Sequence, residues 1–335
     1  MKQRTLALAG DQNQGFEQHR RPTRRDVFLA SMEQLVPWSA LCAVIEPFYP
    51  KRGNGRPPVG LERMVRMYFV QQWFNLADEA CEEALLDSTA LRRFVGIDLG
   101  CERVPDGTTL LKFRRLLEKH QLGAALFAQV NETLESRGLK VGTGTIVDAT
   151  IIGAAGSTKN AHKARDPEMR QTRKGQQWYF GMKAHAGVDA GTGLVHSVTV
   201  TGANVHDLDE ITRLVRADDQ VVYADAGYQG VEKRPDIAAD RHLSQVTWQV
   251  AARKGVLKTM PAPDRQIESR KASVRAKVEH VFLILKRDFA FAKTRYRGLA
   301  KNLNLVQVAM ASANLLMLAR ATVIQTRLTT PATTG

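Results

Sequence analysis

The chain has 335 residues, of which 44% are hydrophobic, and it carries 48 Lys and Arg against 34 Asp and Glu for a formal net charge of +14. This length predicts about two domains, and the apolar content excludes a mostly disordered chain. The charge favours an acidic partner, most commonly nucleic acid, although many basic proteins only have solvated Lys and Arg surfaces.

Cysteine usage and hydropathy narrow the possible classes of protein further. Cys42, Cys81 and Cys101 are scattered along the chain, so we expect neither a disulfide framework nor a cysteine zinc site, and a reducing cytoplasm fits. No run approaches about 18 consecutive apolar residues, and the N-terminus lacks a charged-then-apolar pattern. The sequence therefore predicts no membrane span and no secreted product.

The first part of the chain is predicted to be helical. Residues 1–25 are polar and basic without apolar periodicity, which predicts a flexible basic arm. Over residues 26–140 apolar residues recur at helical spacing, and Gly- and Pro-containing turns separate the repeats. We therefore predict an all-helical N-terminal domain over 26–140.

The pattern changes to β-branched runs after residue 142. Strands are predicted at 145–150, 179–190, 194–201, 220–228 and 245–252, with a helical stretch before the fourth of these. Strands mixed with helices indicate an α/β domain, here 141–325. The polar segment 153–177 is long enough to be functional or disordered, and residues 326–335 are predicted to be a disordered tail.

Two of the predicted strands carry an acid where apolar residues are expected. Asp148 lies within a β-branched run, and Asp225 follows one directly. A buried unpaired carboxylate costs several kcal/mol, so each acid alone is most simply a turn cap or the partner of an arginine. If parallel strands bring both acids together, their repulsion raises a pKa or calls for a divalent cation with oxygen ligands.

A basic helix predicted at 268–289 carries a third acid. Arg275, Glu279 and Lys286 fall within one narrow sector at about 100° per residue, beside an apolar stripe. The simpler interpretation is an ion pair between residues four apart, worth a few tenths of a kcal/mol. The functional interpretation makes Glu279 a metal ligand, with Arg275 and Lys286 holding phosphates or orienting the acid.

Another predicted helix has one basic and one apolar face. Residues 105–120 contain a turn, a threonine cap and a helix whose apolar positions oppose Lys112, Arg115 and Lys119. This face suits phosphate contacts, and a solvated basic face explains it nearly as well. Further cations, with Trp178 just beyond the first group, lie at 159–174 and at 286–301, the latter group including Lys286 and Arg287.

The ordered set of motifs resembles a known family. The segments 31–38, 44–51, 145–152, 179–207, 223–230 and 275–287 are, in this order, similar to transposases of the bacterial insertion sequence 5 family, which have an Asp-Asp-Glu active site. The resemblance covers nearly the whole chain. The family's Arg-Glu-Lys signature falls on Arg275, Glu279 and Lys286, but the tyrosine expected before the arginine is replaced by Ala272.

The resemblance implies a ribonuclease H-like, retroviral integrase-like catalytic core with an all-helical N-terminal DNA-binding domain. In such a core Asp148 ends the first strand, Asp225 ends the fourth and Glu279 projects from a later helix. Together they would bind Mg²⁺, with Mn²⁺ able to substitute, because paired divalent ions activate a nucleophile and stabilise a leaving oxygen in phosphoryl transfer.

The resemblance also implies the partners and setting. We expect binding of terminal inverted repeats and target DNA, cleavage at the element ends, joining of 3′-hydroxyl ends to target DNA, a homodimer or larger assembly, and a bacterial cytoplasmic protein associated with the nucleoid. Tyr228 and Gln229 are predicted to contact DNA or support the site. Two alternatives are a catalytically inactive DNA-binding repressor and a structure-selective nuclease of the same fold.

The sequence supports a role in the site less strongly at three further residues. His206 and Asp207 could approach the metal, but His206 could equally cap a helix that begins near Asp207. His185 is predicted to be a packed or hydrogen-bonded strand residue.

Overall fold

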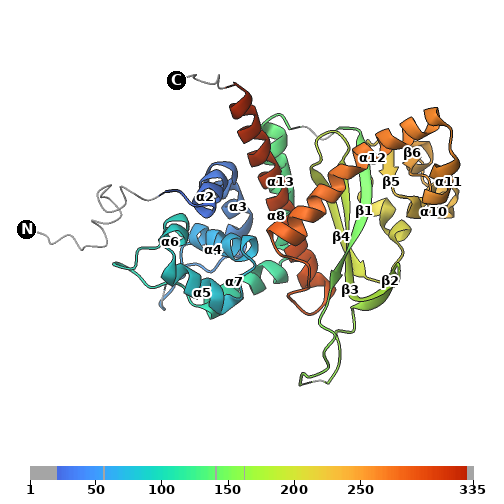
Figure 1. Cartoon of the computed structure of the whole chain (residues 1–335). Coiled ribbons are helices and arrows are strands. Elements are labelled where there is room, and N and C mark those ends of the chain that lie inside the picture. Colours follow the sequence, from blue (N-terminus) through green and yellow to red (C-terminus); the bar gives the residue numbers. More distant parts are fainter. Residues whose placement is uncertain (1–20, 56, 140–141, 162, 330–335) are drawn as a thin grey trace, which may run out of the picture. The chain divides into compact units, whose positions relative to one another are not determined.

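The computed structural model describes residues 21–55, 57–139, 142–161 and 163–329 (Figure 1). Within these ranges every element before residue 140 is helical. A short 3-10 turn, η1 (Glu46–Phe48), follows the second helix. The α-helices are α2 (Arg24–Leu35), α3 (Trp38–Ile45), α4 (Leu61–Trp73), α5 (Asp78–Asp87), α6 (Thr89–Val95), α7 (Gly107–Lys119) and α8 (Leu122–Ser136).

Local hydrogen bonds set the start of α2. The Thr23 hydroxyl accepts from the Asp26 N–H at 3.2 Å, and the Asp26 carboxylate accepts from the Thr23 N–H at 2.8 Å. This reciprocal capping box starts the helix at Arg24. The predicted end of the arm at residue 25 is therefore wrong by two residues, and residues 1–20 lie outside the described ranges.

The chain divides into two compact units. The smaller contains the residues up to Leu122 together with those from Leu318 onward, and the larger is Gly123–Met317. The predicted boundary at residues 140–141 differs from this division by one helix, α8. In the smaller unit α4 is the central helix, and its Phe69 ring makes edge-to-face contacts with Trp38 at 5.7 Å and Trp73 at 5.4 Å.

The larger unit is built on a mixed six-stranded sheet, which confirms the predicted α/β core. The strand order is β2-β3-β1-β5-β6, with β4 paired to β3. Pairing is antiparallel for β1–β3, β2–β3 and β3–β4, and parallel for β1–β5 and β5–β6. The strands are β1 (Gly144–Gly153), β2 (Arg170–Lys174), β3 (Gln177–Asp189), β4 (Val195–Gly202), β5 (Val221–Ala224) and β6 (Thr247–Val250).

Strand β2 was not among the predicted strands, because it lies inside the polar segment 153–177. Its side chains are mostly exposed, so it lacks the apolar alternation that marks a half-buried strand. Asp225 therefore follows the fifth strand of the chain instead of the fourth. The predicted helical stretch before β5 is present as η2 (Asp207–Glu210) and α9 (Ile211–Leu214).

The two faces of the sheet have different neighbours. Val147 and Val222 point into an apolar core with Ile211 and Leu214 from α9. Because side chains alternate along a strand, the neighbours of Val147 point to the other face. Helix α12 (Ala262–Leu283) contacts β1, β3 and β5 (Figure 1).

A buried polar cluster anchors the start of β1. Asp219, which is 1% exposed, accepts hydrogen bonds from the Thr145 hydroxyl at 2.6 Å and from the Arg216 backbone N–H at 2.8 Å. The Thr145 hydroxyl also lies 2.9 Å from His196 Nε2. Burial, together with the Arg216 charge, lowers the pKa of His196 to about 4. This cluster fixes the strand that carries Asp148.

Helix α13 (Leu299–Thr329) ends the described chain. Over Leu299–Arg320 its length and composition would allow it to cross a membrane, but 72% of its most apolar stretch is buried, as expected of a core helix. Among the described residues, α2 and α3–η1 together are long and apolar enough for a span only if their 68° bend is ignored. Because α13 continues to Thr329, the predicted tail begins too early, and residues 330–335 lie outside the described ranges.

Candidate active site

Asp148 and Asp225 occupy neighbouring positions on two parallel strands. The β1–β5 register pairs Ile146 with Tyr223 and ends there, because β5 stops at Ala224. Continuing this register by two residues puts Asp148 level with Asp225, the first residue after β5, and the Asp225 charge is near enough to act on the Asp148 carboxyl. The structure therefore brings the first two predicted acids together.

Asp148 lies in the middle of its strand. Strand β1 continues to Gly153 because it remains paired with β3, where Asp148 is opposite Ala186. The implied position of Asp148 at the end of the first strand is wrong for this reason. Asp225, by contrast, follows β5 directly and caps the 3-10 turn η3 (Ala226–Tyr228), where its carboxylate accepts from the Gly227 N–H at 2.8 Å.

The surroundings of Asp148 disfavour the charged form of its carboxyl group. Burial, together with the charges of Asp225 and Asp207, raises the pKa of Asp148 to about 6. The Ala149 N–H, which donates to Asp148 at 2.7 Å, and the Arg275 charge act in the opposite direction. A cation bound beside this carboxyl group would stabilise its charged form.

This shift predicts a pH-dependent cost to stability. The folded pKa of Asp148 is about 6, above its ordinary 3.8, so the associated stability is fully present below about pH 4 and is lost as the pH rises through 6. In metal-free buffer, Asp148→Asn should therefore raise the free energy of unfolding by up to about 3 kcal/mol at pH 7.5.

Urea denaturation at pH 4 and pH 7.5 measures this effect. At pH 4 the two proteins should differ little in stability, because Asp148 is then protonated in the folded state and only partly ionised in the unfolded state. Equal stability at pH 7.5 would show that the Asp148 carboxylate is adequately solvated or paired.

Glu279 is exposed on α12, one turn beyond Arg275. Among the residues in the described ranges, no group of three His, Cys, Asp or Glu side chains is arranged to hold a metal ion. The joining of Glu279 to the two aspartates therefore stays a prediction. Two adjacent carboxylates that repel one another are nevertheless a donor set suited to a hard divalent cation.

The basic residues after Glu279 lie beyond the regular α-helix. Helix α12 begins at Ala262 and ends at Leu283, and Ile284–Asp288 form a π-helical turn, η6. Lys286 lies within this wider turn, so its common face with Arg275 and Glu279 stays a prediction. Burial and the nearby Lys174 charge lower the pKa of half-buried Lys286. Arg287 is exposed and pairs with Asp288 at 2.7 Å.

His206 and Asp207 have distinct roles in the structure. The exposed His206 caps η2, since its Nδ1 accepts from the Leu208 N–H at 3.2 Å; the capping interpretation is confirmed. Asp207 pairs with Lys183, its Oδ1 lying 2.9 Å from the Lys183 Nζ, and contributes to the field at Asp148. Of the two residues, Asp207 is the one placed near the candidate site.

His185 lies behind Asp207 and is a packed strand residue, as predicted. It is fully buried, and its Nε2 is 2.8 Å from the Thr201 hydroxyl. Its Nδ1 lies 3.8 Å from Asp207 Oδ1. Burial lowers the pKa of His185, while the charge of Asp207 opposes that shift.

Tyr228 is a core residue and not a surface contact. It is 1% exposed and packs in the apolar core below the sheet, so the prediction that its side chain contacts DNA is wrong. Its hydroxyl has no hydrogen-bond partner within the described structure. Burial raises the pKa of Tyr228 above its usual range, and the three nearby aspartates add to this effect. Gln229 is exposed, and its side chain donates to the Ala251 carbonyl at 3.3 Å.

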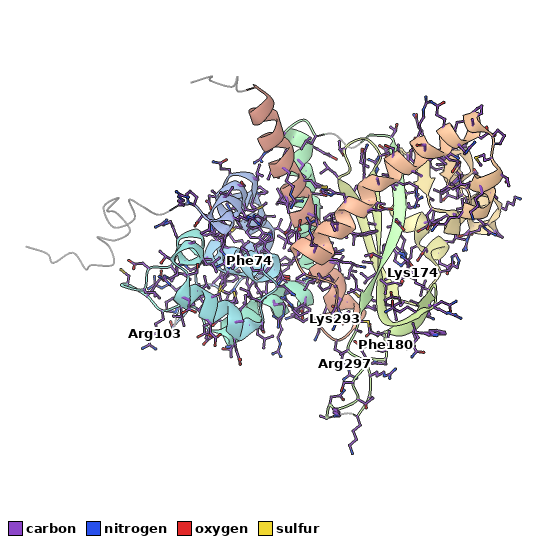
Figure 2. All side chains as sticks on the ribbon, viewed as in Figure 1. Phe74, Arg103, Lys174, Phe180, Lys293 and Arg297 are labelled. Atoms are coloured by element: carbon purple, nitrogen blue, oxygen red, sulfur yellow. The ribbon has the colours of Figure 1, made fainter. Side chains whose placement is uncertain are left out.

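A cavity of about 550 Å³ opens beside Asp225. It lies between the ends of β5 and β6 and helices α11 (Lys254–Thr259) and α12. Its polar lining includes Asp225, Arg265, Glu268 and Arg275. Beyond η6, Lys293 and Arg297 add positive charge on the larger unit (Figure 2).

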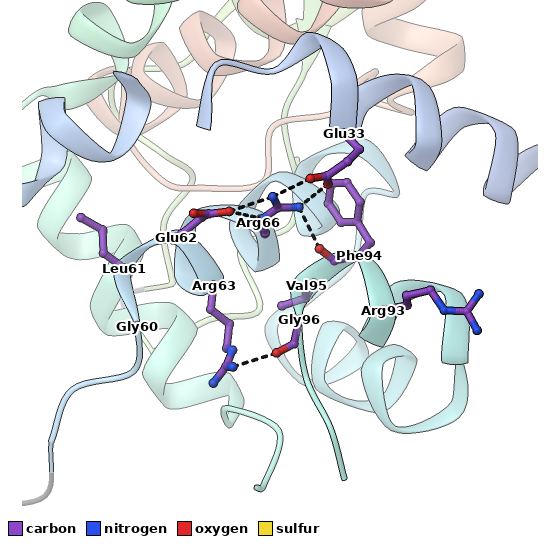
Figure 3. Close-up of a pocket in the computed structure, with 10 residues that line it drawn as sticks. All are labelled: Glu33, Gly60, Leu61, Glu62, Arg63, Arg66, Arg93, Phe94, Val95 and Gly96. Atoms are coloured by element: carbon purple, nitrogen blue, oxygen red, sulfur yellow. Dashed lines mark hydrogen bonds and ion pairs between the residues drawn. The ribbon is translucent and has the colours of Figure 1, made fainter. Parts of the chain in front are cut away.

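A second hollow, in the smaller unit, is a structural feature (Figure 3). It is lined by Arg66, whose guanidinium donates to Glu33 at 2.8 Å, to Glu62 at 2.8 Å and to the Phe94 carbonyl at 3.0 Å. The same group lies 4.4 Å from the Trp38 ring centroid. Because these contacts satisfy the arginine, we assign no chemistry to this hollow.

The predicted basic face is present on α7. Lys112, Arg115 and Lys119 are exposed, while Phe113 and Leu117 on the opposite side are buried. The N-cap is Asp106, which accepts from the Thr109 N–H at 2.6 Å. The expected threonine cap is therefore wrong, because the aspartate just before the helix fulfils that role.

Comparisons with known proteins identify the family. Residues 140–315 match the family described as "Transposase DDE domain", and residues 16–116 match "Transposase domain (DUF772)". A solved piggyBac transposase, in a synaptic complex with hairpin DNA, is similar with a TM-score of 0.47 and 12% identity, over 90% of this chain and 75% of that one. Since the first match covers more than half of the sequence, the chain belongs to the DDE transposases.

Proposed function

We propose that this transposase belongs to the insertion sequence 5 group, binds the terminal inverted repeats of its element, cleaves at the element ends and joins the 3′-hydroxyl ends to target DNA by Mg²⁺-dependent phosphoryl transfer. The observation that carries this proposal is the juxtaposition of Asp148 and Asp225 on one face of a parallel strand pair, with Asp148 held at a raised pKa.

Asp148 and Asp225 would hold the divalent ion, with Glu279 as the third ligand and Mn²⁺ able to substitute. When bound, the ion would supply Lewis-acid activation of the attacking oxygen and neutralise charge on the leaving oxygen. Asp148 is partly buried, and the Ala149 N–H orients its carboxylate.

Arg275 supplies the compensating charge. It lies close enough to Asp148 to lower that residue's pKa, so the cation stabilises the carboxylate in the free protein. The same guanidinium is suited to contact a DNA phosphate, because a planar guanidinium binds phosphate oxygens bidentately. Lys286 and Arg287 would extend this contact along the strand.

Cleavage and joining assays test the proposal. The substrate is a linear DNA that carries the terminal inverted repeats, incubated with supercoiled target plasmid and either Mg²⁺ or EDTA. We expect nicks at the element ends and joined products with Mg²⁺ only. Binding without cutting would indicate the repressor, and cutting of branched DNA without joining would indicate the nuclease.

The α7 face is proposed as a phosphate-contacting surface. Combined replacement of Lys112, Arg115 and Lys119 by alanine should weaken DNA binding and lower the slope of log affinity against log salt by up to about three, because each phosphate contact contributes about 0.9. Fluorescence anisotropy over a salt series measures this slope.

The matched control replaces three other exposed cations of the smaller unit, Lys51, Arg52 and Arg103, with alanine. The control has the same net charge as the variant, so an equal fall in slope for both would show that only overall charge matters and would contradict a specific role for α7.

Assembly and location complete the proposal. Two element ends must be held together for joining, so we propose a homodimer or larger complex on DNA in the bacterial cytoplasm, associated with the nucleoid. Light scattering of the protein with and without terminal-repeat DNA measures the assembly.

A further inference from the structure

The β2–β3 hairpin presents an aromatic side chain to solvent. Trp178, near the start of β3, is 65% exposed, the highest value among the exposed large hydrophobic residues in the described parts of the chain. The turn before it is tight, with Gly175 at a positive φ of 61° and Lys174 paired with Gln177. A planar partner stacked on the ring would remove its apolar faces from water, which is favourable.

The strand register places Trp178 on the same side of the sheet as the candidate acids. Along β3, Trp178 and Ala186 are separated by an even number of residues, and Ala186 is the partner of Asp148. Alternation therefore puts Trp178 and Asp148 on one face. Phe180 shares this face, and the Arg165 guanidinium lies 5.3 Å from its ring centroid.

Positive charge gathers at this end of the hairpin. Arg173 is directly opposite Trp178 in the β2–β3 register. Lys174, at the end of β2 (Figure 2), lies close enough to Lys286 for the pKa of Lys286 to fall. Two like charges repel, and an anion between them would relieve that repulsion. The nearby acid Asp288 pairs with Arg287.

We propose that this hairpin is a stacking platform for an unpaired base of bound DNA, with Trp178 against the base and Arg173, Lys174 and Lys286 against the flanking phosphates. The inference rests on the proposed function, since it takes DNA as the substrate. Aromatic rings beside cations are the usual means of binding single strands, because every base has a face that can stack. Bases inside an intact duplex have no free face, so the platform favours opened DNA.

The platform lies within reach of the strand that is cut. Eight residues separate Trp178 from Ala186, a distance of at most about 26 Å along an extended strand. At roughly 3.4 Å per nucleotide, this spans no more than about eight nucleotides from the phosphate at Asp148.

Tryptophan fluorescence tests the proposal. Of the four tryptophans, Trp38 and Trp73 are buried and Trp248 is partly buried, so Trp178 should respond most to a stacked base. Titration with a single-stranded thymidine oligonucleotide should quench emission in the wild type but not in Trp178→Phe. Trp178→Ala should bind this strand about tenfold more weakly, a change typical of losing one base stack. An abasic strand of equal length should bind both proteins alike, because it keeps the phosphates and lacks the bases.

Two results would overturn the platform. One is equal quenching in Trp178→Phe and wild type. The other is loss of self-association in Trp178→Ala with unchanged DNA affinity, which would make the surface a contact between copies of the chain. Ile267→Ala, at another exposed apolar residue of the larger unit, is the control and should match wild type throughout.

The platform and the transposase activity can fail separately. Asp148→Asn should keep the quenching while losing cleavage, which isolates the stacking contact from the chemistry. Quenching without any cleavage by the wild type would count against the proposed reaction, whereas cleavage without quenching would count against the platform alone.

Discussion

Asp148→Asn and Asp225→Asn are each expected to lower Mg²⁺-dependent cleavage by about a thousandfold or more. An amide keeps the size of the carboxylate but removes the negative charge that would bind the cation, and Lewis-acid stabilisation is worth several kcal/mol. Single-turnover cleavage of terminal-repeat DNA, with folding checked by circular dichroism, measures the loss. At Asp148 the same substitution is expected to stabilise the metal-free fold, so unfolding would not explain a loss of activity there.

Asp218→Asn provides a charge-matched control. Asp218 lies in the same unit, is largely exposed and is 3.8 Å from Arg216, so its removal should leave cleavage unchanged. Full activity in a folded Asp148→Asn protein would refute the site. Glu279→Gln tests the third ligand separately: a comparable loss would support it, and retained activity would remove Glu279 from the site.

Gly181→Val is expected to destabilise the larger unit by at least about 3 kcal/mol. Gly181 is opposite Gly153 in the β1–β3 ladder, and a Cβ at this position would lie 2.1 Å from the Ile152 carbonyl oxygen. Because backbone atoms would have to move, the cost exceeds that of ordinary overpacking. Chemical denaturation measures the change, and the strand that carries Asp148 should lose its pairing first.

The control for this substitution is Gly156→Val. Gly156 has no heavy atom within 4 Å of an added Cβ and no positive φ, so the same change of side chain should leave stability within about 0.5 kcal/mol. If both variants lost equal stability, the cause would be the valine itself and not the close approach of β1 and β3.

The sequence predicted the sheet and the two aspartates because both depend on local patterns. Runs of β-branched residues mark β1, β4 and β5, and an acid within such a run is visible without coordinates. Strand β2 was not predicted, because its charged residues are held in a strand by their pairing with β3 and not by their own strand propensity. The propensity of single residues predicts little where pairing between strands determines the structure.

The errors at individual residues have similar causes. The burial of Tyr228 depends on the turn after β5, which directs the ring into the core instead of toward solvent. The π turn that contains Lys286 is not anticipated by helical periodicity. The sequence left open whether Asp207 approaches the site, and the fold places its charge near Asp148.

The different backbone settings of the two aspartates have a consequence for engineering. Asp148 is clamped in a ladder that continues past it on the β3 side, whereas Asp225 begins a turn that includes two glycines, Gly227 and Gly230. The position of the Asp148 carboxylate is thus fixed by its strand, whereas the position of the Asp225 carboxylate depends on the turn. Variant libraries of the loop after Asp225 should therefore change the preference for larger or smaller cations without disturbing the sheet.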